Sequence, residues 1–202
     1  FAEHGGQAVR RGPDGAWYVI AGNDAKFSAA HVTLASSPIR RIEGGALLRF
    51  NDQGIEAVAH GFRNPYDFDW NDFGDLFTYD SDSERDYFLP WYAPTRLYHI
   101  APTGHHGWRL EGFTRSWPRP DYYDDTVDIL ARVGRGSPTG VVCYRHTQFP
   151  PYFHSGLFAL DWTFGRIYFL PLAPNGSSYA ATPEVFMEPI GTHGFAPTDL
   201  AV

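Results

Sequence analysis

Short alternating strands separated by tight glycine-containing turns recur along this chain, and this pattern restricts its fold more than any other feature. The turn at residues 12–15 (GPDG) leads into an aromatic strand at residues 16–20. Similar turns at residues 51–54 (NDQG) and 71–74 (NDFG) each join two apolar segments. Glycine supplies the positive φ that a tight hairpin needs. The sequence therefore predicts a series of antiparallel hairpins.

The segments between these turns indicate an all-β fold. Glycine (21 residues) and proline (16 residues) interrupt the chain every few positions, and no window keeps apolar residues at helical spacing over three turns. Residues 156–161 (GLFALD) form one more apolar strand of the same kind. Repeated four-stranded antiparallel units are the blades of a β-propeller, in which neighbouring blades cover each other. We therefore expect an incomplete β-propeller.

The number of blades and the ends of the chain follow from this interpretation. At about 40 to 50 residues per blade, the 202 residues make about three to four blades of a fold that we expect to have six. Residues 196–202 resemble the strand at residues 66–70. Residues 4–11 are expected to form the strand before the first turn, with nothing ahead of it to complete that blade. The prediction is one domain over residues 1–202, a partial propeller truncated at both ends. Alone, this piece is expected to be inactive and to aggregate through its open strand edges.

Two long segments separate the predicted strands in the middle of the chain. Residues 87–117 are rich in aromatic side chains, and residues 118–135 follow directly. Both are expected to be loops between strands. Loops of this length in a compact domain usually carry function.

Charge and cysteine content exclude several classes of function. The net charge is −7 and Lys26 is the only lysine, so no basic stripe is expected for nucleic acid. The single cysteine, Cys143, excludes a disulfide within the chain and a CxxCH haem site in this piece. No apolar run reaches the length of a membrane span, so no transmembrane segment is expected.

The motif at residues 61–65 (GFRNP) ends a predicted strand and contains two candidate binding residues. Proline keeps the preceding backbone extended, so Arg63 and Asn64 are held at the strand terminus, where loops open on one face of a propeller. Taken alone, the motif is equally compatible with a structural loop whose arginine pairs with a carboxylate. Together with the acidic loop and the Gly-Trp that follow, however, it resembles the signature of soluble PQQ-dependent glucose and sorbosone dehydrogenases.

This resemblance assigns roles to three residues. His4 precedes Gly12 by eight residues, the spacing at which the family places its catalytic histidine ahead of a Gly-Pro-Asp-Gly turn. The resemblance implies that His4 is the general base, and removing a proton from a sugar hydroxyl calls for a neutral imidazole near neutral pH. It also implies that Arg63 and Asn64 contact PQQ, since a guanidinium suits carboxylates and developing negative charge. Without the family, a lone histidine near a terminus would more often be a surface residue.

The loop at residues 80–86 (DSDSERD) stands where the family binds the calcium ion that polarises the quinone. Asp80, Asp82 and Glu84 are the candidate ligands, because alternating oxygen donors on a loop suit Ca²⁺. The family uses a Gly-Pro and backbone carbonyls here, whereas this chain has carboxylates. A solvated charged loop at a strand end is the equally weighted alternative.

Later motifs carry weaker assignments. The region from residue 137 to residue 168 most resembles the membrane-bound dehydrogenase branch of the superfamily, which is often fused to c-type haem domains. It makes Arg145 and Arg166 candidates for contacting the cofactor, although exposed arginines pairing with acids are at least as common. His105 and His106 are adjacent, so they would point to opposite sides of a strand and are read as structural or substrate-rim residues.

The resemblance implies a quinoprotein oxidoreductase with PQQ and Ca²⁺ as cofactors and a sugar or polyol as substrate. A c-type cytochrome domain is the implied electron acceptor, and the implied location is periplasmic or extracellular. The alternative is a propeller that has lost the chemistry and binds carbohydrate or protein, because a fold alone does not define a function. A lactonase-type hydrolase would need carboxylates and an asparagine from several blades around calcium, and that full set is not found.

Overall fold

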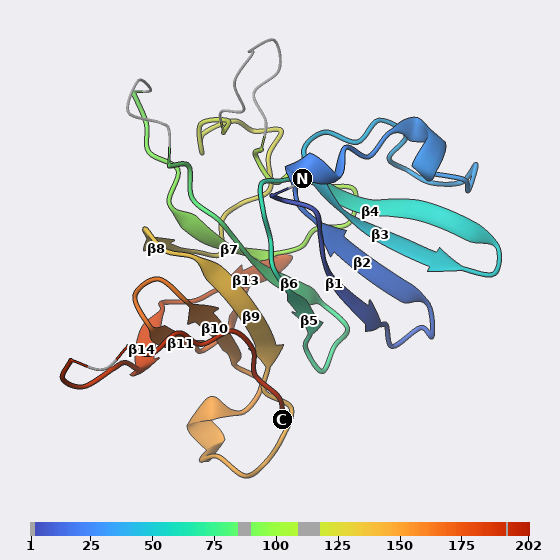
Figure 1. Ribbon diagram of the computed structural model, residues 1–202. Coiled ribbons are helices and arrows are strands. Elements are labelled where there is room, and N and C mark those ends of the chain that lie inside the picture. The colour runs from blue at the N-terminus through green and yellow to red at the C-terminus, as the bar shows by residue number, and fades with distance from the viewer. Residues whose placement is uncertain (1–2, 85–89, 109–117, 193) are drawn as a thin grey trace. The chain divides into compact units, whose positions relative to one another are not determined.

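The computed structural model describes residues 3–84, 90–108, 118–192 and 194–202. The chain divides into two compact units. The first unit comprises Phe1–Tyr66, Ser83–Ala93 and Ile100–Asp128, and the second comprises Asp67–Asp82, Pro94–His99 and Ile129–Val202. Each unit is built on four-stranded antiparallel sheets (Figure 1).

The first unit contains one sheet in which neighbouring strands follow each other along the chain. Its strands are β1 (Gly6–Arg11), β2 (Trp17–Ala21), β3 (Gly45–Asn51) and β4 (Gly54–Phe62), in the spatial order β1-β2-β3-β4. The predicted turns at residues 12–15 and 51–54 join β1 to β2 and β3 to β4, which confirms both hairpins. Gly15 (φ 82°) and Gly54 (φ 143°) have the positive φ that these turns require.

The second unit contains two such sheets. One has the order β5-β6-β7-β8, and the other has the order β14-β11-β10-β9. Their strands are β5 (Phe68–Trp70), β6 (Leu76–Asp80), β7 (Thr95–His99), β8 (Ala131–Gly134), β9 (Pro138–Cys143), β10 (Leu157–Asp161), β11 (Arg166–Leu170) and β14 (Glu184–Met187). A two-stranded hairpin, β12 (Ala173–Asn175) and β13 (Ser178–Ala180), lies between β11 and β14 in the chain.

Strand β10 shows why the second unit stacks sheet on sheet. All five of its residues are buried. Leu157 and Ala159 belong to an apolar cluster shared with the β5–β8 sheet, whereas Phe158 and Leu160 belong to a second cluster on the opposite face. A strand that is apolar on both faces must be covered on both, as in the blades of a propeller.

Side chains also accept hydrogen bonds from the backbone N–H groups at the edge of β9 that lies beside β5. The Asp67 carboxylate accepts the Val141 N–H (3.1 Å) and the Asp69 carboxylate accepts the Cys143 N–H (2.9 Å). Buried backbone donors need such partners. The two aspartates, both buried, thereby join neighbouring sheets of the second unit.

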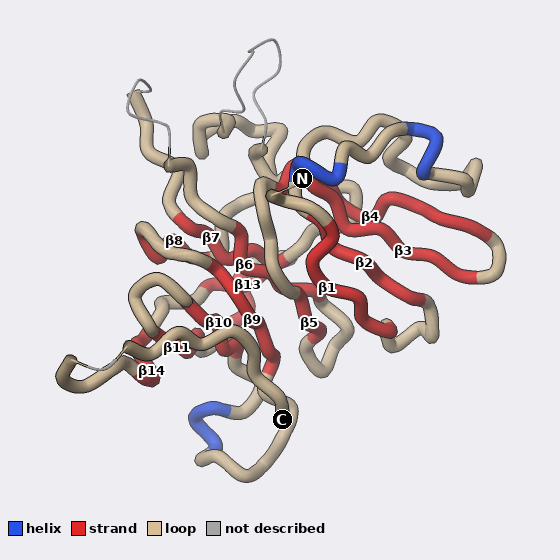
Figure 2. The backbone as a smooth tube through the Cα atoms, in the orientation of Figure 1, coloured by secondary structure: helices blue, strands red, loops and turns tan. Residues whose placement is uncertain are grey.

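Two expectations about the middle and the end of the chain were wrong. Segments 87–117 and 118–135, expected to be loops, each contain a strand: β7 and β8. Residues 196–202 form no strand, although the Thr198 carbonyl accepts the Gly140 N–H at 3.0 Å. The helical segments in the described residues are three short 3₁₀ turns: η1 (Asn23–Ala25), η2 (Ala29–His31) and η3 (Pro151–Phe153) (Figure 2). Among those residues, no helix has the length and apolar character to span a bilayer.

Candidate functional site

The topology of the first sheet brings the predicted catalytic and binding residues to one end of it. Each strand runs antiparallel to the next, so the start of β1 and the end of β4 lie at the same end of the sheet. His4 precedes β1, while Arg63 and Asn64 follow β4. Gly22 and Asn23, which follow β2, lie at that end too.

His4 is oriented by a hydrogen-bonded chain of side chains. Its Nδ1 lies 2.7 Å from Oδ1 of Asn23, and Nδ2 of Asn23 donates to Oδ1 of Asp24 at 3.3 Å. Because the amide nitrogen is engaged by Asp24, the amide oxygen faces the imidazole and can only accept. In neutral His4 the proton therefore sits on Nδ1, and Nε2 keeps the lone pair that a general base uses.

Gly22 is the point at which the site residues converge. A Cβ placed on Gly22 would lie 2.7 Å from His4 Cβ, 2.8 Å from Asn64 Oδ1 and 2.9 Å from the Arg63 carbonyl. The Asn23 N–H donates to that same Arg63 carbonyl at 2.8 Å. Asn64 is fixed from the other side, since Gln7 Nε2 donates to its Oδ1 at 2.9 Å. Only glycine leaves room for this arrangement.

Substituting Gly22 with alanine is expected to lower the free energy of unfolding by about 1 to 3 kcal/mol, the usual cost of overpacking. Backbone strain is not the reason, because Gly22 has an ordinary φ of −79°. Gly6→Ala is the matched control, because a Cβ there meets nothing within 4 Å. Urea unfolding of both variants checks this, and equal midpoints would contradict the convergence at Gly22.

Arg63 lies against an aromatic surface and pairs with an acid. Its guanidinium carbon is 5.5 Å from the centroid of the Trp108 ring, and its side chain is 11% exposed. Nη2 of Arg63 lies 3.4 Å from Oε2 of Glu84, whose side chain is 67% exposed. Trp108 is itself buried, so its ring gives the Arg63 guanidinium a surface that is fixed in position.

The loop carrying Trp108 is attached to the end of β4. The Trp108 N–H donates to the Gly61 carbonyl (2.7 Å), and the His106 N–H donates to the His60 carbonyl (2.8 Å). Gly61 has φ 79°, and a Cβ there would lie 2.5 Å from His105 Nδ1. The glycine of the GFRNP motif is thus required for close approach of this loop, which then supports the neighbouring Arg63.

Two buried histidines, His105 and His106, lie beside the half-buried His60 behind this loop. The rings of His60 and His105 meet edge to face at 4.7 Å, whereas His106 stacks on Phe62 at 4.2 Å. The adjacent histidines therefore have different neighbours. Burial lowers the pKa of His105 to about 3, and it also lowers the pKa of His60.

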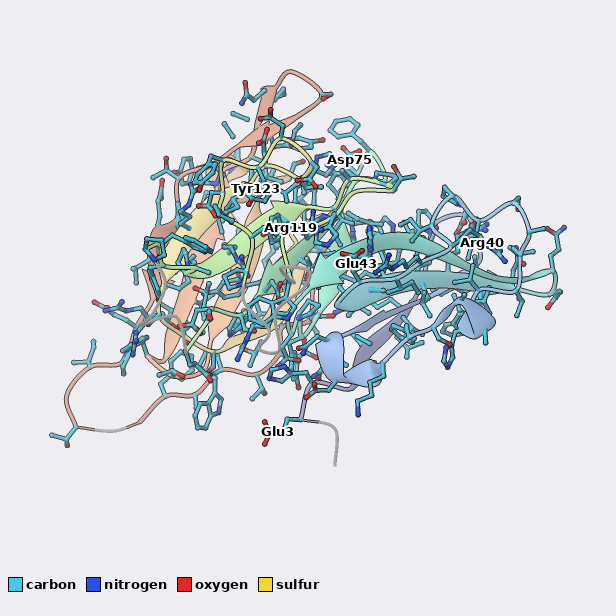
Figure 3. The ribbon with its side chains drawn as sticks, turned by 90° about the horizontal axis from the view of Figure 1, so that it is seen from above. Glu3, Arg40, Glu43, Asp75, Arg119 and Tyr123 are labelled. Carbon is cyan, nitrogen blue, oxygen red and sulfur yellow. The ribbon has the colours of Figure 1, made fainter. Side chains whose placement is uncertain are left out.

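The carboxylate of Glu43 does not reverse the lowering of the His105 pKa. Its Oε2 lies 3.4 Å from His105 Nε2, but the same oxygen lies 3.2 Å from Nη2 of Arg119 (Figure 3). The guanidinium offsets the carboxylate, so burial decides the direction of the His105 pKa.

The free energy of unfolding is expected to decrease as the pH falls, because of His105. The folded-state pKa of about 3 is below the ordinary value of 6.5, so the unfolded state binds the proton first as the pH falls. Between pH 7 and pH 5 this group alone should lower the free energy of unfolding by about 2 kcal/mol. Urea unfolding at both pH values, in wild type and His105→Gln, measures the difference. Identical losses in the two proteins would show that His105 is not the group responsible.

The predicted calcium ligands do not form a cluster. Asp80 is fully buried in β6 and pairs with Arg96 on the neighbouring strand β7, with Nη2 of Arg96 3.8 Å from Oδ2 of Asp80. Asp82 is buried in the second unit, and Glu84 belongs to the first unit, where it pairs with Arg63. Within the described residues, no three His, Cys, Asp or Glu side chains are placed to hold a metal ion. Calcium binding by these three carboxylates stays a prediction.

Arg145 and Arg166 belong to the second unit, and both lie beside acids. Nη1 and Nη2 of Arg145 are each 3.3 Å from Oδ1 of Asp69, and Nη1 also donates to the Trp70 carbonyl. Nε of Arg166 lies 3.5 Å from Oε2 of Glu188. Their contact with a cofactor stays a prediction.

The structure therefore places His4, Asn64 and the Arg63 backbone around Gly22, and it pairs the Arg63 side chain with Glu84, all within the first unit. Sequence reasoning missed Asn23 and Trp108, which orient His4 and Arg63. The signal for Trp108 was its place in the Gly-Trp turn, but no local feature distinguishes Asn23 from an ordinary turn residue.

Comparison with solved structures gives the fold of this chain. The PQQ-bound form of aldose sugar dehydrogenase from Streptomyces coelicolor matches 97% of this chain with a TM-score of 0.63 and 20% identity, over 52% of its own length. An oxidoreductase from Thermus thermophilus, named as a glucose dehydrogenase, matches 99% with a TM-score of 0.68 and 18% identity, over 57% of its length. The apo form of the soluble aldose sugar dehydrogenase from Escherichia coli matches 89% with a TM-score of 0.58 and 14% identity, over 53% of its length.

These similarities show that the chain has the all-β propeller fold of those dehydrogenases, as the sequence predicts. The chain spans about half the length of the solved structures that it matches. No protein-family model matches it, and no curated protein matches it as a relative.

Proposed function

We propose that the protein carrying this chain, here the parent protein, is a quinoprotein oxidoreductase that oxidises a hydroxyl group of a sugar or polyol. The observation that carries the proposal is the hydrogen bond between His4 Nδ1 and Asn23 Oδ1, at the sheet end that also holds Arg63 and Asn64. It orients an imidazole for proton removal at the same sheet end as a cation suited to a polycarboxylate. The fold, shared with a PQQ-bound sugar dehydrogenase, agrees with this chemistry.

The residues present fit PQQ, which is a planar, aromatic tricarboxylate. Arg63 offers a mostly buried guanidinium over an indole ring, and guanidinium groups bind carboxylates and stack on planar groups. Asn64 adds an amide held in place by Gln7. When bound, PQQ supplies the hydride acceptor.

The chain's own residues then perform the proton transfer. His4 Nε2 accepts the proton of the substrate hydroxyl as hydride leaves the carbon, which places a positive charge on the imidazole. Asn23 keeps the ring in the productive tautomer, and its carbonyl oxygen stabilises the imidazolium through the Nδ1–H. Arg63 stabilises negative charge that develops on the acceptor.

Further parts of the proposal rest on the sequence resemblance. They are a relation to the membrane-bound dehydrogenase branch, a c-type cytochrome domain as electron acceptor, and a periplasmic or extracellular location. Arg145 and Arg166 are additional candidates for contacting the cofactor. Calcium ligation by Asp80, Asp82 and Glu84 stays a prediction of the sequence resemblance, and no step is assigned to calcium.

A catalytically inactive binding module is the second candidate. The pairing of Asp80 with Arg96 and of Arg145 with Asp69 favours it, because side chains predicted for cofactor chemistry are engaged within the protein. Such a module would bind carbohydrate or protein without electron transfer.

Reconstitution of the parent protein with PQQ separates the two candidates. Reduction of an artificial dye is measured with a panel of aldoses and polyols, with and without PQQ. The proposal predicts reduction that requires both PQQ and substrate. Sugar binding with no PQQ-dependent reduction would instead establish the binding module.

A further inference from the structure

Arg63 and Glu84 are paired, but the protein holds them very differently. The Arg63 side chain is 11% exposed and lies over Trp108, whose backbone is hydrogen-bonded to Gly61. The Glu84 side chain is 67% exposed. The Arg63 guanidinium is therefore held in place by the fold, whereas the Glu84 carboxylate is exposed to solvent.

The geometry of the pair is also loose. The distance between Nη2 of Arg63 and Oε2 of Glu84 is 3.4 Å, long for a charge-assisted hydrogen bond, which is typically below 3 Å. Only one nitrogen and one oxygen are involved in this contact. An exposed single-point ion pair contributes little to stability. Replacing the Glu84 carboxylate with the carboxylate of a ligand therefore lowers the stability of the protein only slightly.

We propose that Glu84 is a resident counter-ion of Arg63, and that a carboxylate of an aromatic polycarboxylate ligand replaces it when the ligand binds. This inference rests on the proposed function in taking Arg63 as the anion-binding residue. It gives Glu84 a role different from the metal ligation implied by the resemblance. Glu84 thereby sets the affinity of the site for anions without touching substrate.

Two effects of Glu84 act in the same direction. Its carboxylate competes for the guanidinium, and its charge repels an incoming anion. Both are Coulombic and exposed to solvent, so salt screens both. Removing the charge should raise the affinity for an anionic ligand most at low ionic strength.

The test is equilibrium dialysis of the parent protein with two probes. One probe is PQQ, and the other is trimesate, an aromatic tricarboxylate without a quinone. Glu84→Gln is compared with wild type and with Glu56→Gln, which removes the same charge from another ion pair of the first unit, that with Arg49 at 2.8 Å. Arg63→Ala reports whether binding requires the guanidinium.

Glu84→Gln is expected to bind both probes about fivefold more tightly at low salt, with the gain shrinking below about twofold in high salt. Glu56→Gln should match wild type, and Arg63→Ala should lose the binding. Equal PQQ affinity in wild type and Glu84→Gln, with sugar oxidation intact, overturns the counter-ion role and leaves the proposed function standing. Tighter trimesate binding in Glu84→Gln without any PQQ binding supports the role of Glu84 and overturns the proposed function.

Discussion

Replacing His4 with alanine in the PQQ-loaded parent protein is expected to lower the rate of sugar oxidation by about 10²- to 10⁴-fold, the range that a positioned general base contributes. Affinity for PQQ should change by less than about threefold, because the guanidinium of Arg63 remains. Steady-state dye reduction measures the rate, and equilibrium dialysis measures the affinity. Loss of rate with retained binding would place His4 in the chemistry.

Asn23→Ala provides the control for this prediction. Asn23 does not act on the substrate in the proposed mechanism, but its Oδ1 holds the Nδ1–H of His4 at 2.7 Å. Without it both imidazole tautomers are populated, so the rate should fall, but by less than in His4→Ala. Wild-type activity in His4→Ala would remove His4 from the mechanism.

Replacing Asp80 with asparagine is expected to lower the free energy of unfolding by about 3 kcal/mol. Asp80 and Arg96 are 0% and 1% exposed, so the substitution breaks an ion pair inside the protein. Urea unfolding of the parent protein measures the change. Asp52→Asn, at an exposed turn position, is the matched control and should change stability by less than about 0.5 kcal/mol.

Calcium separates a structural Asp80 from a metal ligand. A structural role predicts the same loss of stability with calcium and with a chelator. A variant that is as stable as wild type in chelator, but no longer gains stability from calcium, would restore Asp80 as a ligand.

The parts of the fold that the sequence predicts are those determined by local chemistry. Glycine turns at residues 12–15 and 51–54 specify hairpins because positive φ restricts the choice of residue. Strand β7 (Thr95–His99) was missed because burial on both faces removes the alternation of polar and apolar residues. Arg96 in its centre also obscures the strand, since the partner that makes its burial tolerable lies on β6.

The candidate site also has parts that the sequence predicts and parts that depend on the tertiary fold. The motif around Arg63 and Asn64 is continuous in sequence, so it could be recognised. Its meeting with His4 depends on the antiparallel order of four strands, and the role of Asn23 depends on that meeting. Glu84 was predicted as a metal ligand because a run of acidic residues does not reveal which cation each one faces. In the structure it faces Arg63.

The most direct measurement of the central claim is an anaerobic single turnover of the PQQ-loaded parent protein. Substrate is added from the panel of aldoses and polyols, and the absorbance of the bound quinone is followed. The account predicts that at least one substrate converts the oxidised spectrum to the reduced one, and that His4→Ala slows this conversion by about 10²-fold or more. Bound PQQ whose spectrum stays oxidised with every substrate would contradict it.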